Sequence, residues 1–298
     1  MSSSAVALPK ATVSQRARTV SRVRNAAVFY VGVAILSVFF MGPFIWTVIS
    51  SLKDASEIAT FPPTFLPKQL HWENYPNAWS RVPFLNFYIN SILVTGLATF
   101  GQTVTATLVA YGFARFRFPW KNALFMLVMS TLMVPWEVTI VPSFLLFRTL
   151  GWLDTLAPLI VPHWLGGGPF FIFLLRQFFM TIPRDYDEAA KIDGANSLQV
   201  LWEILVPLCR PAITTVAIFA ALFHWNAFIE PLIFLNTPEK FTISLGLRYF
   251  QTAPLDAGEP KEHLLMAGTI IMIVPCVVLF FAAQRYFVKG IVLSGLKG

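Results

Sequence analysis

Long apolar stretches alternate with shorter polar segments along almost the whole chain. Each apolar stretch has about 20 residues or more, which is the length that an α-helix needs to cross the hydrocarbon core of a bilayer. The expected spanning helices cover residues 26–50, 88–114, 123–144, 156–180, 212–232 and 264–287. The pattern therefore predicts an all-α, polytopic membrane protein with six transmembrane helices.

The polar segments divide this chain further. Residues 1–25 are expected to form a cytoplasmic arm ahead of a transmembrane domain at 26–298. Residues 51–83 are rich in proline and too polar to span, so they are expected to form an ordered external loop. A second external loop is expected at about 236–261, and residues 181–211 are the longest polar stretch on the inner side.

Charge sets the expected orientation. Only 12% of the 298 residues are charged, against about 25% in soluble proteins. Most of the 22 Lys and Arg residues fall on the N-terminal arm and on every second loop after it. This bias favours a cytoplasmic N-terminus and C-terminus. The gathering of cations on cytoplasmic loops also explains the net charge of +7 better than nucleic-acid binding does. The apolar stretch at residues 26–50 is too long for the core of a cleaved signal peptide, so we expect it to remain as the first spanning helix.

The inner segment 181–211 is expected to form a helix, a turn and a second helix. Thr181 is the expected N-cap of the first helix, and Asp185, Asp187 and Glu188 place negative charge at its positive end. Gly194 can adopt the left-handed conformation that ends a helix. The next helix begins after a cap at Asn196 or Ser197.

The second helix of this segment carries apolar residues at helical spacing. They are Leu198, Leu201, Trp202 and Leu205, with Pro207 breaking the pattern before the next span. A short acidic helix braced by an amphipathic one suits a groove on a partner protein. An ordinary amphipathic cytoplasmic loop has the same spacing, so the residues alone leave both interpretations open.

The inner segment resembles the EAA loop of binding-protein-dependent ABC transporter permeases. The matching residues are Glu188-Ala189-Ala190, Asp193-Gly194-Ala195 and Ile204-Leu205-Val206-Pro207, where Val206 replaces a common leucine. The segments Asn90-Ser91, Ala110 to Pro119 and Trp225-Asn226 resemble the maltose-permease branch, which takes up carbohydrates. Ala227 departs from that branch, which often has an aspartate after Trp-Asn.

This resemblance implies a type I ABC importer fold in the bacterial inner membrane. It implies a second permease subunit, two ATPase subunits that carry ATP and Mg, an extracytoplasmic binding protein, and a sugar or oligosaccharide as solute. This chain itself would hold no cofactor and catalyse no reaction. A glycerol-phosphate permease and, less favoured, a secondary transporter remain as alternatives, as does a homodimer instead of a heterodimer.

The same resemblance assigns ATPase coupling to one set of residues. Glu188 is the expected charged anchor, Ala189 and Ala190 the close-packing face, and Gly194 the turn. The full set is Glu188, Ala189, Ala190, Asp193, Gly194, Ala195, Ile204 and Pro207.

Polar groups inside the spans are candidates for the solute pathway, because burying them in lipid is costly. Asn90, Glu137, His224 and Asn226 are the candidates, with His224 and Asn226 the preferred pair, although packing or interfacial solvation explains each of them too. The chain lacks a phosphate-binding loop for ATP. Gly166-Gly167-Gly168 before Pro169 predicts a break in the fourth span, and the scattered histidines predict no metal site.

Overall fold

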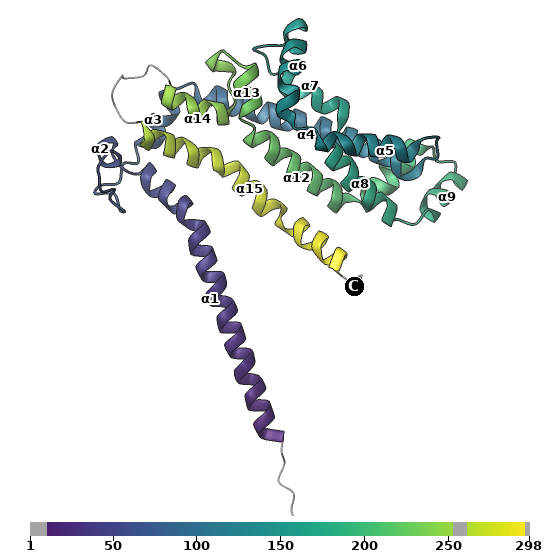
Figure 1. Cartoon of the computed structure of the whole chain (residues 1–298), viewed down its shortest axis with the longest axis horizontal. Coiled ribbons are helices and arrows are strands. Elements are labelled where there is room, and N and C mark those ends of the chain that lie inside the picture. The colour runs from purple at the N-terminus through teal and green to yellow at the C-terminus, as the bar shows by residue number, and fades with distance from the viewer. Residues whose placement is uncertain (1–10, 253–260, 296–298) are drawn as a thin grey trace, which may run out of the picture.

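The computed structural model describes residues 11–252 and 261–295, and the regular structure in these ranges is helical throughout. The long helices are α1 Ala11–Ser51, α4 Phe84–Arg115, α12 Arg210–Asn226 and α15 Glu262–Gly295, together with the pair α7 Ala157–Gly166 and α8 Pro169–Thr181. In Figure 1, α4, α12 and α15 run side by side along the length of the bundle. The fold is the predicted all-α membrane bundle.

Four helical segments are long and apolar enough to cross a membrane on their own, and up to six spans are present if each of two bent pairs counts as one. The prediction of one continuous helix at 123–144 is wrong. The chain forms α5 Lys121–Ser130, a 3₁₀ turn, and α6 Trp136–Thr149, bent by 96°. Pro135 causes the break, because it forces Val134 into an extended conformation with ψ 114°.

The fifth and sixth expected spans also differ at their ends. The helix expected at 212–232 ends at Asn226, and a separate helix, α13 Ile229–Phe234, follows. The helix expected at 264–287 is longer at both ends, as α15. The break predicted from the three glycines is confirmed, because Gly167 and Gly168 both have positive φ angles between α7 and α8.

Helix α4 is the centre of the bundle, with α7, α8 and α12 packed against it. Small residues on α4 let these neighbours approach closely. A Cβ atom on Gly101 would lie 2.2 Å from the Trp164 ring of α7, and Trp164 Nε1 donates a hydrogen bond of 2.9 Å to the Leu97 carbonyl. A Cβ atom on Gly167 would likewise lie 2.5 Å from the backbone nitrogen of Ala106.

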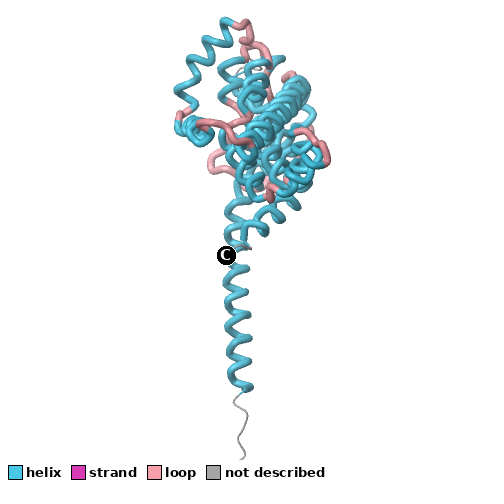
Figure 2. Tube along the Cα trace, turned by 90° about the vertical axis from the view of Figure 1, so that its right-hand side faces the viewer, coloured by secondary structure: helices cyan, strands magenta, loops and turns pink. Residues whose placement is uncertain are grey.

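Helix α1 leaves this bundle. The C-terminal end of α1 contacts α15, and the rest of α1 extends well beyond the other helices, as Figures 1 and 2 show. Its apolar side chains from Val28 to Phe40 are mostly exposed. A helix with apolar residues on all sides requires lipid or another membrane protein around it.

The segment 51–83 contains α2 Ala55–Ile58 and α3 Asn74–Ser80 and is tied to the end of α1. The buried Asn74 amide donates to the carbonyl oxygens of Ser51 (2.9 Å) and Lys53 (2.8 Å). The second expected external loop, at about 236–261, contains the 3₁₀ turn Pro238–Lys240 and α14 Ile243–Thr252. Residues 253–260 of this loop lie outside the described residues.

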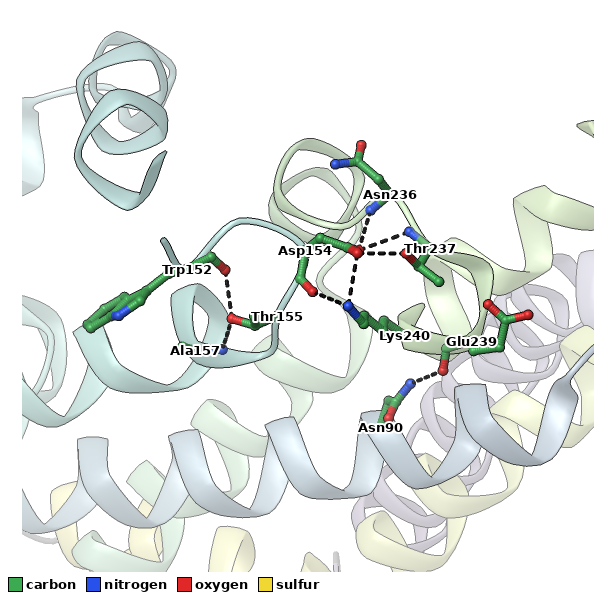
Figure 3. Close-up of polar contacts among 9 residues, drawn as sticks. All are labelled: Asn90, Trp152, Asp154, Thr155, Ala157, Asn236, Thr237, Glu239 and Lys240. Atoms are coloured by element: carbon green, nitrogen blue, oxygen red, sulfur yellow. Dashed lines mark hydrogen bonds and ion pairs between the residues drawn. The ribbon is translucent and has the colours of Figure 1, made fainter. Parts of the chain in front are cut away.

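Asp154 connects the turn before α7 to the loop after α13, as Figure 3 shows. Its carboxylate accepts hydrogen bonds from the backbone N–H groups of Asn236 and Thr237 (both 2.9 Å), from the Thr237 hydroxyl (2.6 Å) and from Lys240 Nζ (2.9 Å). These hydrogen bonds stabilise the charged carboxylate and hold the pKa of Asp154 well below its usual range. The bond from the Thr237 hydroxyl has the largest effect on this pKa. The two loops therefore form one ordered surface.

Candidate coupling site

The inner segment forms the predicted helix, turn and second helix. The first helix is α9 Asp185–Ile192, and Asp185, Asp187 and Glu188 occupy its first turn as expected. Thr181 does not cap it. It is the last residue of α8, and its hydroxyl donates to the Phe178 carbonyl at 2.7 Å. Ile182, Pro183 and Arg184 separate the two helices, so α9 begins too far along the chain for the Thr181 side chain to reach its amides.

Gly194 ends α9 with a φ angle of +85°. The Gly194 N–H donates to the Lys191 carbonyl (3.1 Å), and the Ala195 N–H donates to the Ala190 carbonyl (2.9 Å). This pair of bonds satisfies carbonyl groups at the helix end, as in a Schellman motif. The predicted role of Gly194 as the turn between the two helices agrees with this geometry.

Asn196 then caps the second helix, which begins with α10 Ser197–Gln199. The Asn196 side chain accepts hydrogen bonds from the N–H groups of Leu198 and Gln199, and Gln199 Oε1 accepts from the Asn196 N–H at 2.8 Å. This is a capping box. The prediction of a cap at Asn196 or Ser197 is thereby resolved to Asn196.

The expected apolar stripe on this second helix is only half right. Leu201 and Leu205 are fully buried, but Leu198 and Trp202 are 59% and 44% exposed. The segment Val200–Leu205 is a π-helical turn. A π turn has more residues per turn than an α-helix, so it changes which positions share a face. Val200 is buried in place of Leu198.

The last two expected coupling residues are on this second helix. Ile204 is half-buried against the core, and Pro207 lies in the short helix α11 Val206–Leu208. The chain bends by 84° at Cys209, just after α11, before α12 begins. The interruption predicted at Pro207 is therefore present two residues later.

An ion pair that the sequence analysis missed attaches α9 to the end of α4. Arg115 Nε lies 3.0 Å from Asp187 Oδ2, and both side chains are nearly buried. The two terminal nitrogens of Arg115 donate to the Ile182 carbonyl at 3.1 Å. The Tyr111 hydroxyl donates to the Ser197 carbonyl at 3.0 Å. Arg115 was part of the segment that carried the resemblance, but nothing in its spacing indicated Asp187 as its partner.

The structure divides the expected coupling residues into two groups. Glu188, Ala189 and Asp193 are exposed, and Ile192 beside them is 86% exposed. Ala190 is buried against this chain's own core. Ala195 also packs there, partly buried. The outward face of α9 is therefore short and mostly acidic, with Tyr186 (50% exposed) near its start and Ile192 at its end as its large apolar side chains.

A buried polar cluster lies where α4, α7 and α12 meet. His224 Nε2 donates to Gln102 Oε1 at 2.8 Å, and the rings of His224 and His163 are 4.3 Å apart at their centroids. Gln102 lies midway along α4, and its amide is close to Gly168 at the helix break. Sequence analysis missed Gln102, although a glutamine within a spanning helix is a signal of the same kind as Asn90.

The other pathway candidates lie apart from this cluster. Asn226 is exposed and donates to the Leu222 carbonyl of its own helix at 2.8 Å, so it is on another face of α12 from His224. Asn90 Nδ2 donates to the carbonyl oxygens of Glu239 and Phe241. Glu137 is exposed in the first turn of α6.

Comparison with known proteins assigns the family. Residues 102–292 match the family described as "Binding-protein-dependent transport system inner membrane component". The chain is 31% identical to a diacetylchitobiose uptake system permease of Streptomyces coelicolor, over 91% of this chain and 88% of that protein. It is 31% identical to a sn-glycerol-3-phosphate transport system permease of Yersinia pestis, over 83% of this chain and 88% of that protein.

The fold is also that of a solved importer. It matches a chain of a bacterial ABC transporter for the acidic polysaccharide alginate with a TM-score of 0.77 and 22% identity, over 94% of this chain and all of the other. With its apolar spans and its helix-turn-helix at the inner end, the chain belongs to the binding-protein-dependent inner membrane components, which are the permease subunits of ABC importers and transport components rather than enzymes.

Proposed function

We propose that this permease carries a sugar or an oligosaccharide, delivered by an extracytoplasmic binding protein, in a complex with a second permease and two ATPase subunits that hold ATP and Mg. The family description and the diacetylchitobiose relative support this assignment. The apolar side chains of α1, which this chain leaves uncovered, support a second permease and lipid as neighbours.

The outward face of α9 is the proposed ATPase contact. Glu188 supplies a charge for a basic partner, and the small side chain of Ala189 permits close approach. Asp193 and Ile192 extend this face toward Gly194. Ala190 and Ala195 hold α9 on the core instead of facing the partner. Because α9 is also fixed to α4 through the Arg115–Asp187 pair, a movement of α9 would be transmitted directly to the bundle.

Glu188→Arg tests this contact. The reversed charge should weaken binding of the ATPase subunits by about 10-fold or more, because a like charge then faces the basic partner group. Co-purification of the ATPase subunits and solute-stimulated ATP hydrolysis are the measurements. Glu203→Arg is the matched control, since Glu203 is an exposed acid on the second helix of the same segment. Equal effects of the two variants would contradict a specific role of Glu188.

For the solute, we propose a path beside the break between α7 and α8. Broken helices often line transport pathways, because their free backbone groups need polar or aqueous surroundings. His224, Gln102 and His163 offer donors and acceptors suited to sugar hydroxyl groups at this break. Asn226 is the second proposed contact on α12, whereas Asn90 and Glu137 are proposed contacts closer to the outer surface.

His224→Ala should reduce uptake affinity or rate by about 3- to 10-fold, which corresponds to the loss of one or two neutral hydrogen bonds. Uptake by reconstituted transporter at several solute concentrations is the measurement, with Asn226→Ala alongside. Ser91→Ala is the control, because Ser91 also loses a buried hydrogen bond, to the Ile243 N–H, without touching this cluster. Unchanged affinity and rate in both α12 variants would remove these two residues from the pathway.

A glycerol-phosphate solute is the second candidate, since the relative named for sn-glycerol 3-phosphate is as similar as the chitobiose relative. Screening the cognate binding protein against sugars and phosphorylated polyols distinguishes the two. Selective binding of a phosphorylated polyol would overturn the sugar assignment while leaving the ABC permease assignment intact.

A further inference from the structure

The turn between α4 and α5 contains a cavity that the transport function leaves unexplained. Its volume is about 390 Å³. It is lined by Arg117, Phe118, Trp120, Lys121, Asn122 and Ala123. The turn follows Arg115, whose partner Asp187 is on α9, so the cavity is at the same end of the bundle as the coupling segment.

Trp120 has an unusual conformation in this turn. Its φ angle is +63°, in the left-handed region that bulky residues rarely adopt, and its side chain is 79% exposed. Exposed tryptophans are enriched at the level of lipid headgroups, where the indole ring contacts both apolar and polar groups. The strained backbone thus holds an interfacial side chain at the edge of the cavity.

The charges around the cavity are positive. The electrostatic neighbours of Lys121 are Arg176, Arg184 and Arg117, on α8, at the start of α9 and in the turn itself. Lys121 Nζ donates a hydrogen bond of 2.9 Å to the Phe116 carbonyl, which fixes its position. Two of these cations, Arg117 and Lys121, line the cavity itself. A cluster of four cations, two of them in the cavity wall, creates a positive potential that attracts an anion.

The surroundings of the cavity favour a lipid anion. Helix α5 starts at Lys121, and its first turns display exposed apolar side chains, among them Leu124 and Leu127 at 44% and 63% exposure. These two residues are three positions apart and lie on one face of the helix. A headgroup in the cavity would have its acyl chains beside this face.

We propose that this cavity binds the phosphodiester headgroup of an anionic phospholipid of the inner leaflet. Arg117 and Lys121 contact the phosphate, Trp120 packs at the level of the glycerol backbone, and the exposed face of α5 contacts the acyl chains. Basic pockets at the cytoplasmic ends of membrane helices are suited to such headgroups. The bound lipid would neutralise the cluster next to the coupling segment.

The test uses the complete transporter in nanodiscs or detergent, with phosphatidylglycerol as the probe. Each interfacial cation contributes roughly fivefold to affinity for an anionic lipid surface. Arg117→Gln with Lys121→Gln should therefore lower phosphatidylglycerol retention, measured by native mass spectrometry, by about 25-fold. Arg22→Gln with Arg24→Gln is the matched control. These are also two exposed cations on the same expected side, but they are remote in sequence from the cavity.

Further variants and a competition experiment distinguish lipid binding from binding of other ligands and from a folding defect. Arg117→Lys with Lys121→Arg should retain the lipid, because both charges remain. Displacement of the lipid by excess inorganic phosphate would overturn the proposal in favour of a free anion site. Unchanged lipid retention in the glutamine variant, with loss of ATPase co-purification, would overturn it in favour of a protein contact. Equal losses in the glutamine variant and the Arg22/Arg24 control would also overturn it.

Discussion

Asp187→Ala is expected to destabilise the protein by about 3–5 kcal/mol, because it leaves the buried guanidinium of Arg115 without its carboxylate partner. The effect should extend to function, since the same pair holds α9 on the end of α4. The thermal midpoint of the purified transporter and the ratio of ATP hydrolysis to solute uptake are the measurements. We expect a lower midpoint and weaker coupling.

Asp185→Ala is the matched control for this prediction. Asp185 is an exposed acid in the same first turn of α9, so its removal changes the net charge equally but should cost about 1 kcal/mol or less. A double-mutant cycle with Arg115→Met isolates the pair. A coupling energy near zero, or equal effects of the two aspartate variants, would show that the ion pair does not hold α9 in place.

Gly167→Ala is expected to cost about 3 kcal/mol of stability, through left-handed strain and overpacking together. The φ angle of Gly167 is +63°, and an added Cβ would lie 2.5 Å from the backbone nitrogen of Ala106. The obstructing atoms are backbone, so no change of rotamer relieves the contact. We expect the variant to lower the thermal midpoint and to disturb the break between α7 and α8 near Gln102.

Gly166→Ala is the adjacent control. A Cβ at Gly166 meets nothing within 4 Å, and its backbone is helical, so alanine should be neutral or stabilising by up to about 1 kcal/mol. Thermal unfolding of the two variants in the same detergent compares them directly. A loss of stability in Gly166→Ala as large as in Gly167→Ala would show that the close approach to α4 is not the cause.

Much of the coupling segment was predictable because its determinants are local. The acids at the start of α9, the turn at Gly194 and the cap at Asn196 all act through backbone groups within a few residues. The predictions of an N-cap at Thr181 and of a buried Leu198 were wrong. In both cases a small shift in where a helix begins, or in residues per turn, changed the role of a side chain.

The positions of the apolar stretches and the helix-turn-helix followed from the sequence alone, since bilayer thickness and backbone hydrogen bonding act on short, contiguous stretches. The sequence also contained the Pro135 break, which was overlooked. Helix packing in three dimensions brings distant polar groups together: Arg115 with Asp187, Gln102 with His224, and Asp154 with the loop at Thr237. Those pairings depend on how helices pack, and small-residue packing between helices allows many arrangements that a one-dimensional pattern does not distinguish.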